Sequence, residues 1–244
     1  QYARDLLRKA KGNALLVAKI ERAEAIQSLE EIIQASDAIM VARGDLAVEV
    51  GDAAVPALQK RMIRMSREHN KLVITATQMM ESMMHHPSPT RAEVSDVANA
   101  VLDGTDAVML SGETAAGRYP VQTVQAMARV CEAAEKEDQP GLDRLRTRLP
   151  QDVEEAIGQA TMFTANSLKI KAVAAMTQSG KTVLLMSRAA TAVPIYALSS
   201  VTETRRRVTL FRGVYPIKFK GARDPERCLH MAEDELLKRG AVEL

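Results

Sequence analysis

Short apolar runs rich in β-branched residues alternate with longer segments of helical periodicity in the first half of the chain. The runs that predict strands span residues 14–20, 38–44, 71–78 and 106–112. The segments that predict helices span residues 23–34, 54–69, 91–102 and 120–136. Strands that alternate with helices are typical of parallel β/α architecture, and near-continuous apolar strands favour a sheet buried on both faces.

The composition of the sequence changes near residue 137. Residues 137–150 are polar and include Pro140 and Pro150, so we interpret this segment as a linker. A second α/β series follows, with strand patterns at 172–177, 194–200 and 214–219, and helix patterns at 152–167, from about Thr182, at 203–211 and at 225–239. We therefore predict a larger β/α domain over residues 1–136 and a smaller α/β domain over residues 151–244.

Charged and hydroxylic residues gather where each strand of the first series ends. They are Lys19 and Glu21, Arg43 and Asp45, Thr75 and Thr77, and Ser111 and Glu113. A single strand that ends in charge indicates no more than an ordinary turn. Four such ends, all C-terminal, favour a shared polar site, because a β/α barrel builds its active site at that face.

Two carboxylates on neighbouring strands predict a metal site. Glu21 and Asp45 suit a hard divalent ion such as Mg²⁺ or Mn²⁺, which takes its remaining ligands from water and substrate oxygens. Lys19 lies two residues before Glu21, so both point to the same side of an extended strand and a lysine ammonium can balance charge on a metal-bound anion. The alternative is a simple Lys-Glu surface pair.

Gly44 and Thr77 are candidate anion ligands. Glycine beside the carboxylate lets a small anion approach the backbone amides, and the Thr77 hydroxyl can donate to the same anion. Ser111 and Glu113 are candidates for a proton route through water. The alternative for this pair is a helix entry with serine as the cap.

Composition excludes several classes of partner. Of 244 residues 46% are hydrophobic and 26% charged, and the net charge is only +2, with both signs interspersed. This balance gives no case for nucleic acid or a membrane surface, so we expect small molecules and copies of the chain itself as partners. Cys131 and Cys228 follow no metal-ligand spacing and no apolar run is long enough for a membrane span, so we expect a cytoplasmic protein with reduced thiols.

Residues 175–182, "AMTQSGKT", resemble a phosphate-binding loop. The nucleotide-binding pattern needs glycine where Ala175 stands, so a nucleotide P-loop is disfavoured. The turn nevertheless follows a predicted strand and opens a helix, which favours phosphate binding by backbone amides and side chains. The candidates are Thr177, Ser179, Gly180, Lys181 and Thr182. The alternative is a plain capped helix entry.

Three segments carry a family resemblance: "AKIERAEA", "SDAIMVARGDLAVEVG" and "ITATQMMESMMHHPSPTRAEVSDVANAVLDGTDAVMLSGETAAGRYP". They resemble pyruvate kinases, strongly over residues 1–136 and more weakly over 151–244. The resemblance implies an α/β fold made of the second half of a TIM (β/α)8 barrel, strands five to eight, followed by a smaller α/β regulatory domain, truncated at residue 244. It also implies phosphoryl transfer from phosphoenolpyruvate to ADP, giving pyruvate and ATP.

The resemblance also implies roles for the candidate residues. Lys19 would stabilise the enolate, Glu21 and Asp45 would bind Mg²⁺ or Mn²⁺, and Ser111 would take part in protonating the enolate. The amides of Gly44 and Asp45 and the Thr77 hydroxyl would hold the substrate carboxylate. The turn at 177–182 would hold the phosphate of a sugar-phosphate effector, and Arg91 would lie at a subunit contact of a homotetramer.

The chain also departs from the family pattern. Ala47 replaces the glycine that usually follows "ARGDL", and only four of eight strands are represented. The lid, the K⁺ ligands and several nucleotide and phosphate ligands would lie outside this chain, so we expect no turnover by the isolated chain. Alternatives are a metal-dependent lyase or aldolase acting on pyruvate enolates, and a non-catalytic regulatory fragment. Lys19 two residues before Glu21, with "TATQM" after them, favours the kinase.

Overall fold

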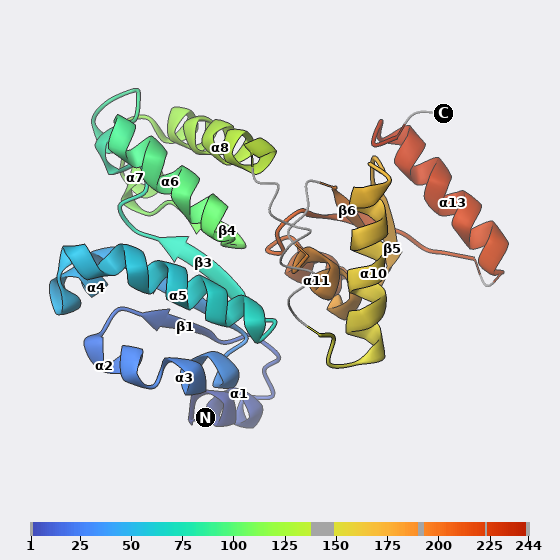
Figure 1. Cartoon of the computed structure of the whole chain (residues 1–244), viewed down its shortest axis with the longest axis horizontal. Helices are drawn as coiled ribbons and strands as arrows, with labels where there is room; N and C mark the ends of the chain where they lie inside the picture. The colour runs from blue at the N-terminus through green and yellow to red at the C-terminus, as the bar shows by residue number, and fades with distance from the viewer. Residues whose placement is uncertain (1, 138–148, 190–192, 223, 243–244) are drawn as a thin grey trace. The chain divides into compact units, whose positions relative to one another are not determined.

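Two compact units make up the chain. A computed structural model describes residues 2–137, 149–189, 193–222 and 224–242. The units are Gln1–Glu137 and Asp138–Leu244, and each contains its own sheet (Figure 1). Most of the predicted linker, residues 138–148, lies outside the described residues.

The sheet of the first unit has the strand order β1-β2-β3-β4, and all its pairs are parallel. Its strands are β1 (Val17–Ile20), β2 (Ala38–Ala42), β3 (Leu72–Ala76) and β4 (Ala107–Met109). Sequential parallel strands need a crossover, and helices supply it at each step. The predicted parallel β/α arrangement is therefore confirmed.

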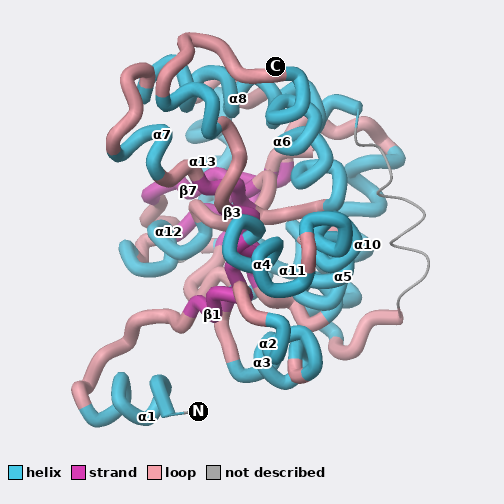
Figure 2. Tube along the Cα trace, turned by 90° about the vertical axis from the view of Figure 1, so that its left-hand side faces the viewer, coloured by secondary structure: helices cyan, strands magenta, loops and turns pink. Residues whose placement is uncertain are grey.

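Helices connect the strands of this sheet and pack against it. They are α1 (Tyr2–Lys9), α2 (Ala23–Gln27), α3 (Leu29–Ala35), α4 (Arg43–Val50), α5 (Val55–Glu68), α6 (Arg91–Asp103), α7 (Gly112–Ala115) and α8 (Pro120–Glu137), with 3-10 turns η1 (Asp52–Ala54) and η2 (Glu81–Met84). Figures 1 and 2 show α2 and α3 beside β1, and α5 packs against β2 and β3. The core between them is built from buried aliphatic side chains such as Ile33, Ile39 and Ile63.

Several element bounds differ from the sequence prediction. The predicted helix over 23–34 is divided at Ser28 into α2 and α3. The predicted strand over 38–44 ends at Ala42, and a helix that the sequence pattern did not predict, α4, begins at Arg43. Leu46 explains this helix, because its fully buried side chain belongs to the same apolar cluster as Ile39.

A methionine-rich cluster joins the loop after β3 to helices α6 and α8. Met79, Met80 and Met83 are fully buried and pack with Val97 of α6 and Met127 of α8. The loop that they anchor runs from β3 to α6, so its path depends on long flexible side chains that fill an irregular space.

The second unit has three parallel strands in the order β5-β6-β7. They are β5 (Val173–Met176), β6 (Ile195–Ser199) and β7 (Val214–Lys218), with helices α10 (Val153–Ser167), α11 (Lys181–Ser187), α12 (Thr202–Val208) and α13 (Pro225–Lys238). Asp152 and Asp224 cap α10 and α13 through their side chains. Leu198, Ile217 and Leu236 form part of its apolar core.

A capping box fixes the start of α6. The Thr90 hydroxyl accepts from the amide of Glu93, and the Glu93 carboxylate accepts from the amide of Thr90 at 2.7 Å. The same carboxylate accepts from the amide of Ser82 at 2.7 Å and from its hydroxyl at 2.6 Å. Partial burial alone would raise the pKa of Glu93, but these hydrogen bonds outweigh burial and hold the pKa below its usual range.

We expect Thr90→Ala to lower the free energy of unfolding by about 1 kcal/mol, because one amide at the start of α6 loses its cap. Glu93→Gln should lower it more at neutral pH than at acid pH. The reason is that the contribution of Glu93 is present above the pKa of an unfolded glutamate and is lost as the pH falls through the lower pKa of the folded state. Urea unfolding at several pH values measures both effects.

Glu81→Gln, on the exposed side of the same loop, is the matched control and should leave the pH profile unchanged. A Glu93→Gln profile parallel to that of the native chain would contradict the assignment.

Candidate active site

Lys19, Glu21 and Asp45 lie together at the carboxyl ends of β1 and β2. Lys19 Nζ donates to Asp45 Oδ2 at 2.9 Å and forms an ion pair with the Glu21 carboxylate. The parallel register pairs Ile20 with Val41, so the residues that follow these two strands emerge side by side. The structure thus brings together the three charged groups that the sequence singled out.

The electrostatics of this cluster favour the charged forms of Lys19 and Asp45. Hydrogen bonds to Glu21 and then to Asp45 raise the pKa of Lys19. The hydrogen bond from Lys19 lowers the pKa of Asp45. The Lys19 side chain is 48% exposed, so solvent screens these interactions. The Lys19 ammonium thus lies between the carboxyl groups of Glu21 and Asp45.

The donor set suits a hard divalent ion. Glu21 and Asp45 already direct oxygens at one cationic group, the Lys19 ammonium. Within the described ranges, no group of three or more His, Cys, Asp or Glu side chains is arranged to hold a metal ion. The cluster itself offers two carboxylates, a donor set that fits Mg²⁺ or Mn²⁺ with the remaining ligands from water or substrate.

Gly44 and Thr77 bond to each other in this structure. The Gly44 amide donates to Thr77 Oγ1 at 2.8 Å, and the Thr77 hydroxyl donates to the carbonyl of Ala76 at 2.7 Å. If both groups face a common ligand, as the sequence predicts, an anion has to exchange with this internal bond. A Cβ at Gly44 would meet Thr77 and Gln78 only at ordinary contact distances, from 3.6 Å upward, so these neighbours do not require glycine here.

The backbone after β3 is strained. Thr77 has φ +65° and Gln78 has φ +52°, both in the left-handed region. A β-branched residue is rare in this region, and each such residue costs about 1–3 kcal/mol. Nothing in the sequence predicted this conformation. Thr75, which the sequence grouped with the site, is instead fully buried and donates to Thr105 Oγ1 at 3.0 Å within the core.

Ser111 and Glu113 have different environments. Ser111 is exposed where α7 begins, and its side chain makes no capping hydrogen bond. Glu113 is buried, and its carboxylate accepts from the amide of Met80 at 3.2 Å and from the amide of Ser111 at 2.7 Å. Backbone amides thus bond to both oxygens of Glu113, and a proton route through this carboxylate stays a prediction.

The sequence grouped Arg43 with the polar strand ends but assigned it no individual role. Its guanidinium is buried and contacts the carbonyl groups of Thr77 and Gln78. The only sequence signal was a charged residue at the end of a buried strand. Its partners were not predictable, because they lie more than 30 positions further along the chain.

The predicted phosphate turn joins β5 to α11. Thr177 Oγ1 accepts from the Gly180 amide at 2.9 Å, and Ser179 Oγ accepts from the Lys181 amide at 3.3 Å. Gly180 has φ +87°, and a Cβ there would lie 3.0 Å from Val208 Cγ1, so the turn requires glycine. Thr182 follows in the first turn of α11.

Two carboxylates hold the lysine of this turn. Lys181 Nζ lies 2.5 Å from Glu154 Oε2 and 3.4 Å from Asp152 Oδ2, both at the start of α10. The hydrogen bond to Glu154 is the main cause of the raised pKa of Lys181. An anion at this turn would have to compete with these carboxylates for the ammonium.

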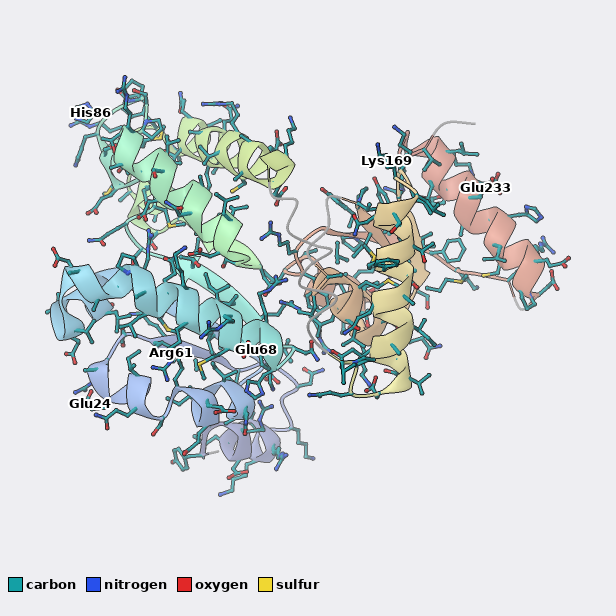
Figure 3. The ribbon with its side chains drawn as sticks, in the orientation of Figure 1. Glu24, Arg61, Glu68, His86, Lys169 and Glu233 are labelled. Carbon is teal, nitrogen blue, oxygen red and sulfur yellow. The ribbon has the colours of Figure 1, made fainter. Side chains whose placement is uncertain are left out.

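Other candidates lie on the surface. His85 and His86, the second labelled in Figure 3, are exposed in the loop before α6. Arg91 is exposed as the first residue of α6. None of the described helices is both long and apolar enough to span a membrane.

Comparison with known proteins gives matches over both units. The family model "Pyruvate kinase, barrel domain" matches residues 1–124, and "Pyruvate kinase, alpha/beta domain" matches residues 155–244. A pyruvate kinase of Buchnera aphidicola from Acyrthosiphon pisum is 52% identical, over 98% of this chain and 51% of that protein. Pyruvate kinase II of Salmonella typhimurium is 52% identical, with the same coverages.

A solved structure gives the same result. The crystal structure of a pyruvate kinase from Cryptosporidium parvum aligns with a TM-score of 0.90 at 35% identity, over 95% of this chain and 48% of that one. The predicted fold class, half of a β/α barrel followed by an α/β domain, is confirmed. The chain spans about half the length of the curated relatives that it matches.

We expect Lys19→Met to raise the pKa of Asp45 toward the ordinary range of an aspartate, because the ammonium that stabilises its charged form is removed. In the native chain the Lys19–Asp45 pair contributes to stability above the pKa of an unfolded aspartate. This contribution is lost as the pH falls through the lower pKa of Asp45 in the folded state. Carboxyl-carbon NMR titration of Asp45 measures the change.

Lys71→Met is a matched control, since Lys71 bonds to the carbonyl of Ser36 at the opposite ends of the strands. An Asp45 titration that is the same in Lys19→Met and in the native chain would contradict the pairing.

Proposed function

Because the chain belongs to the pyruvate kinase family, we propose that the whole protein of which it is part transfers the phosphoryl group of phosphoenolpyruvate to ADP, giving pyruvate and ATP. The observation that carries the proposal is the convergence of Lys19, Glu21 and Asp45 at the carboxyl ends of two adjacent parallel strands. This is the face at which β/α barrels carry out chemistry.

Lys19 and the two carboxylates would serve the phosphoryl transfer. In this reaction the bond from phosphorus to the enol oxygen breaks, and a bond forms to the terminal phosphate oxygen of ADP. Glu21 and Asp45 would hold a Mg²⁺ or Mn²⁺ ion, which when bound neutralises negative charge on substrate oxygens. The Lys19 ammonium would stabilise the enolate oxygen left behind. K⁺ would be bound by residues outside this chain.

The substrate carboxylate would bind beside this cluster. The amides of Gly44 and Asp45 and the hydroxyl of Thr77 are its proposed donors, and binding would exchange the 2.8 Å bond between Gly44 and Thr77 for bonds to the ligand. The neighbours of Gly44 leave room for a Cβ, which supports this interpretation, because a side chain at that position would crowd an anion on the backbone.

The enolate then needs a proton at its methylene carbon. Ser111 is the proposed hydroxyl in a route through water, and its exposed side chain is compatible with this role. Glu113 would act indirectly, by holding the backbone beside Ser111. Its buried carboxylate accepts hydrogen bonds from the amides of Ser111 and Met80. A metal-dependent lyase or aldolase would use a similar pair of carboxylates, and family membership favours the kinase over this alternative and over a non-catalytic fragment.

The second unit would bind an effector. We propose a sugar phosphate at the turn formed by Thr177, Ser179, Gly180, Lys181 and Thr182, where two hydroxyls and an ammonium gather. Binding would require Lys181 to leave Glu154 and Asp152. We further propose that the whole protein is a homotetramer in the cytoplasm, with Arg91 at a subunit contact.

In the whole protein, we expect Lys19→Met to lower kcat by about a hundredfold to a thousandfold, because the group that stabilises the enolate is lost. Affinity for Mn²⁺ should not weaken, since Glu21 and Asp45 remain. A coupled pyruvate assay measures turnover, and electron paramagnetic resonance measures free Mn²⁺.

Lys71→Met controls for a general loss of stability and should keep kcat near the native value. The isolated 244-residue chain should show no turnover in the same assay. Full activity in Lys19→Met would refute the role of Lys19, and an isolated chain as active as the whole protein would refute the need for the other half.

For the effector site, we expect the double variant Asp152→Asn, Glu154→Gln to bind sugar phosphates about threefold more tightly, because two carboxylates no longer compete for Lys181. Asparagine still caps α10. Calorimetric titration with a panel of sugar phosphates measures the affinity. Lys181→Gln should abolish binding and Glu226→Gln, at the start of α13, should not alter it. Equal binding by Lys181→Gln and the native protein would contradict the site.

A further inference from the structure

Arg43 is a buried cation that the mechanism above does not use. It is the first residue of α4 and only 4% exposed, although its neighbour Asp45 lies in the open polar cluster. A buried guanidinium is stable only where its donors are satisfied and its charge is balanced. Its partners therefore show what holds it in place.

The guanidinium of Arg43 donates hydrogen bonds to the strained turn after β3. Nη2 donates to the carbonyl oxygens of Thr77 at 2.7 Å and Gln78 at 2.9 Å, and Nε donates to the Thr77 carbonyl at 3.2 Å. Nη2 also lies 2.8 Å from Met79 Sδ. Three successive residues of the turn thus contact one planar, rigid guanidinium.

Asp96 balances the charge of Arg43 from the other direction. Asp96 lies on α6, and its Oδ2 accepts from Nη1 of Arg43 at 2.6 Å. Its side chain is 48% exposed, whereas that of Arg43 is 5% exposed. Both residues line a cleft of about 330 Å³ that Gln78 also lines. The ion pair can therefore be altered from the solvent side without touching the turn.

The turn needs such a restraint because of its backbone. Thr77 and Gln78 both have positive φ, a conformation that these side chains rarely adopt and that reverts unless surrounding contacts enforce it. The hydroxyl that accepts from the Gly44 amide belongs to Thr77, so the direction of this hydroxyl depends on the strained conformation.

We propose that Arg43 is a positioning residue, which holds Thr77 in its left-handed conformation so that the hydroxyl and the Gly44 amide face one anion subsite, while Asp96 orients the guanidinium. The inference rests on the proposed function, since the subsite is the one assigned to the substrate carboxylate. Arg43 touches no reacting atom. Its effect reaches the substrate only through the carbonyls of Thr77 and Gln78.

A purely structural role for Arg43 makes a different prediction. Loss of an ion pair that only stabilises the barrel would weaken the binding of every ligand together, the divalent ion included. Loss of a positioning group weakens the carboxylate subsite alone, because the hydrogen bonds and ion pairs given above for Arg43 do not involve Lys19, Glu21 or Asp45.

The experiment uses Arg43→Lys in the whole protein. Lysine keeps the charge but lacks the planar guanidinium, so it cannot donate hydrogen bonds to two carbonyls and to Asp96 at the same time. We expect KM for phosphoenolpyruvate to rise by about tenfold or more, from lost charge-assisted hydrogen bonds, with a smaller change in kcat. Affinity for Mn²⁺ should stay at the native value. Asp96→Asn, which keeps an acceptor and removes the charge, should raise KM by about threefold.

A second readout does not depend on activity. Hydrogen exchange of the Gly44 amide, which is bonded to Thr77 Oγ1 in the native structure, should be about tenfold faster in Arg43→Lys. Arg64→Lys is the matched control, because Arg64 is an exposed arginine of α5 paired only loosely, at 4.0 Å, with Glu68. It should change neither KM nor the exchange of Gly44.

The outcomes separate this inference from the proposed function. An unchanged KM in Arg43→Lys, or a fall in Mn²⁺ affinity by the same factor as the rise in KM, overturns the positioning role. If the native protein shows no kinase turnover, the proposed function fails, and the exchange of Gly44 still decides whether Arg43 holds the turn. Exchange as slow in Arg43→Lys as in the native protein overturns it.

Discussion

Parallel pairing of β1, β2 and β3 is the constraint on which the rest of the first unit depends. The register aligns Ile20 with Val41 and Ala42 with Ala76, so the residues that follow each strand leave the sheet at one edge. Backbone hydrogen bonds between parallel strands fix this register, and buried aliphatic side chains on the strands hold it. A charged cluster and a hydroxylic turn thereby become neighbours, although they are far apart in the sequence.

Both candidate ligand sites hold their lysines with carboxylates. Lys19 lies between Glu21 and Asp45, and Lys181 lies between Glu154 and Asp152. In each site the carboxylates raise the pKa of the lysine and keep it charged. The two sites differ in what these carboxylates would do. In the first they are the proposed metal ligands, whereas in the second they would compete with the anion.

The turn after β3 is held from two directions by groups that belong to other elements. The Arg43 guanidinium binds the carbonyls of Thr77 and Gln78, and the Glu113 carboxylate binds the amide of Met80 just beyond them. Both side chains are buried, so their hydrogen bonds are little weakened by solvent. Buried groups thus hold the turn in its strained conformation, which is a condition for a preorganised binding site.

The sequence alone determined the alternation of strands and helices and the cluster of Lys19, Glu21 and Asp45, because apolar periodicity and residues just after strands are local signals. Only the tertiary structure decided that Arg43 turns inward, that Glu113 is held by backbone amides, and that Thr77 has a positive φ. These features depend on contacts such as Arg43 to Asp96, 53 positions apart. Local periodicity carries no information about a partner at that separation, so burial and hydrogen bonding in the folded chain set these roles.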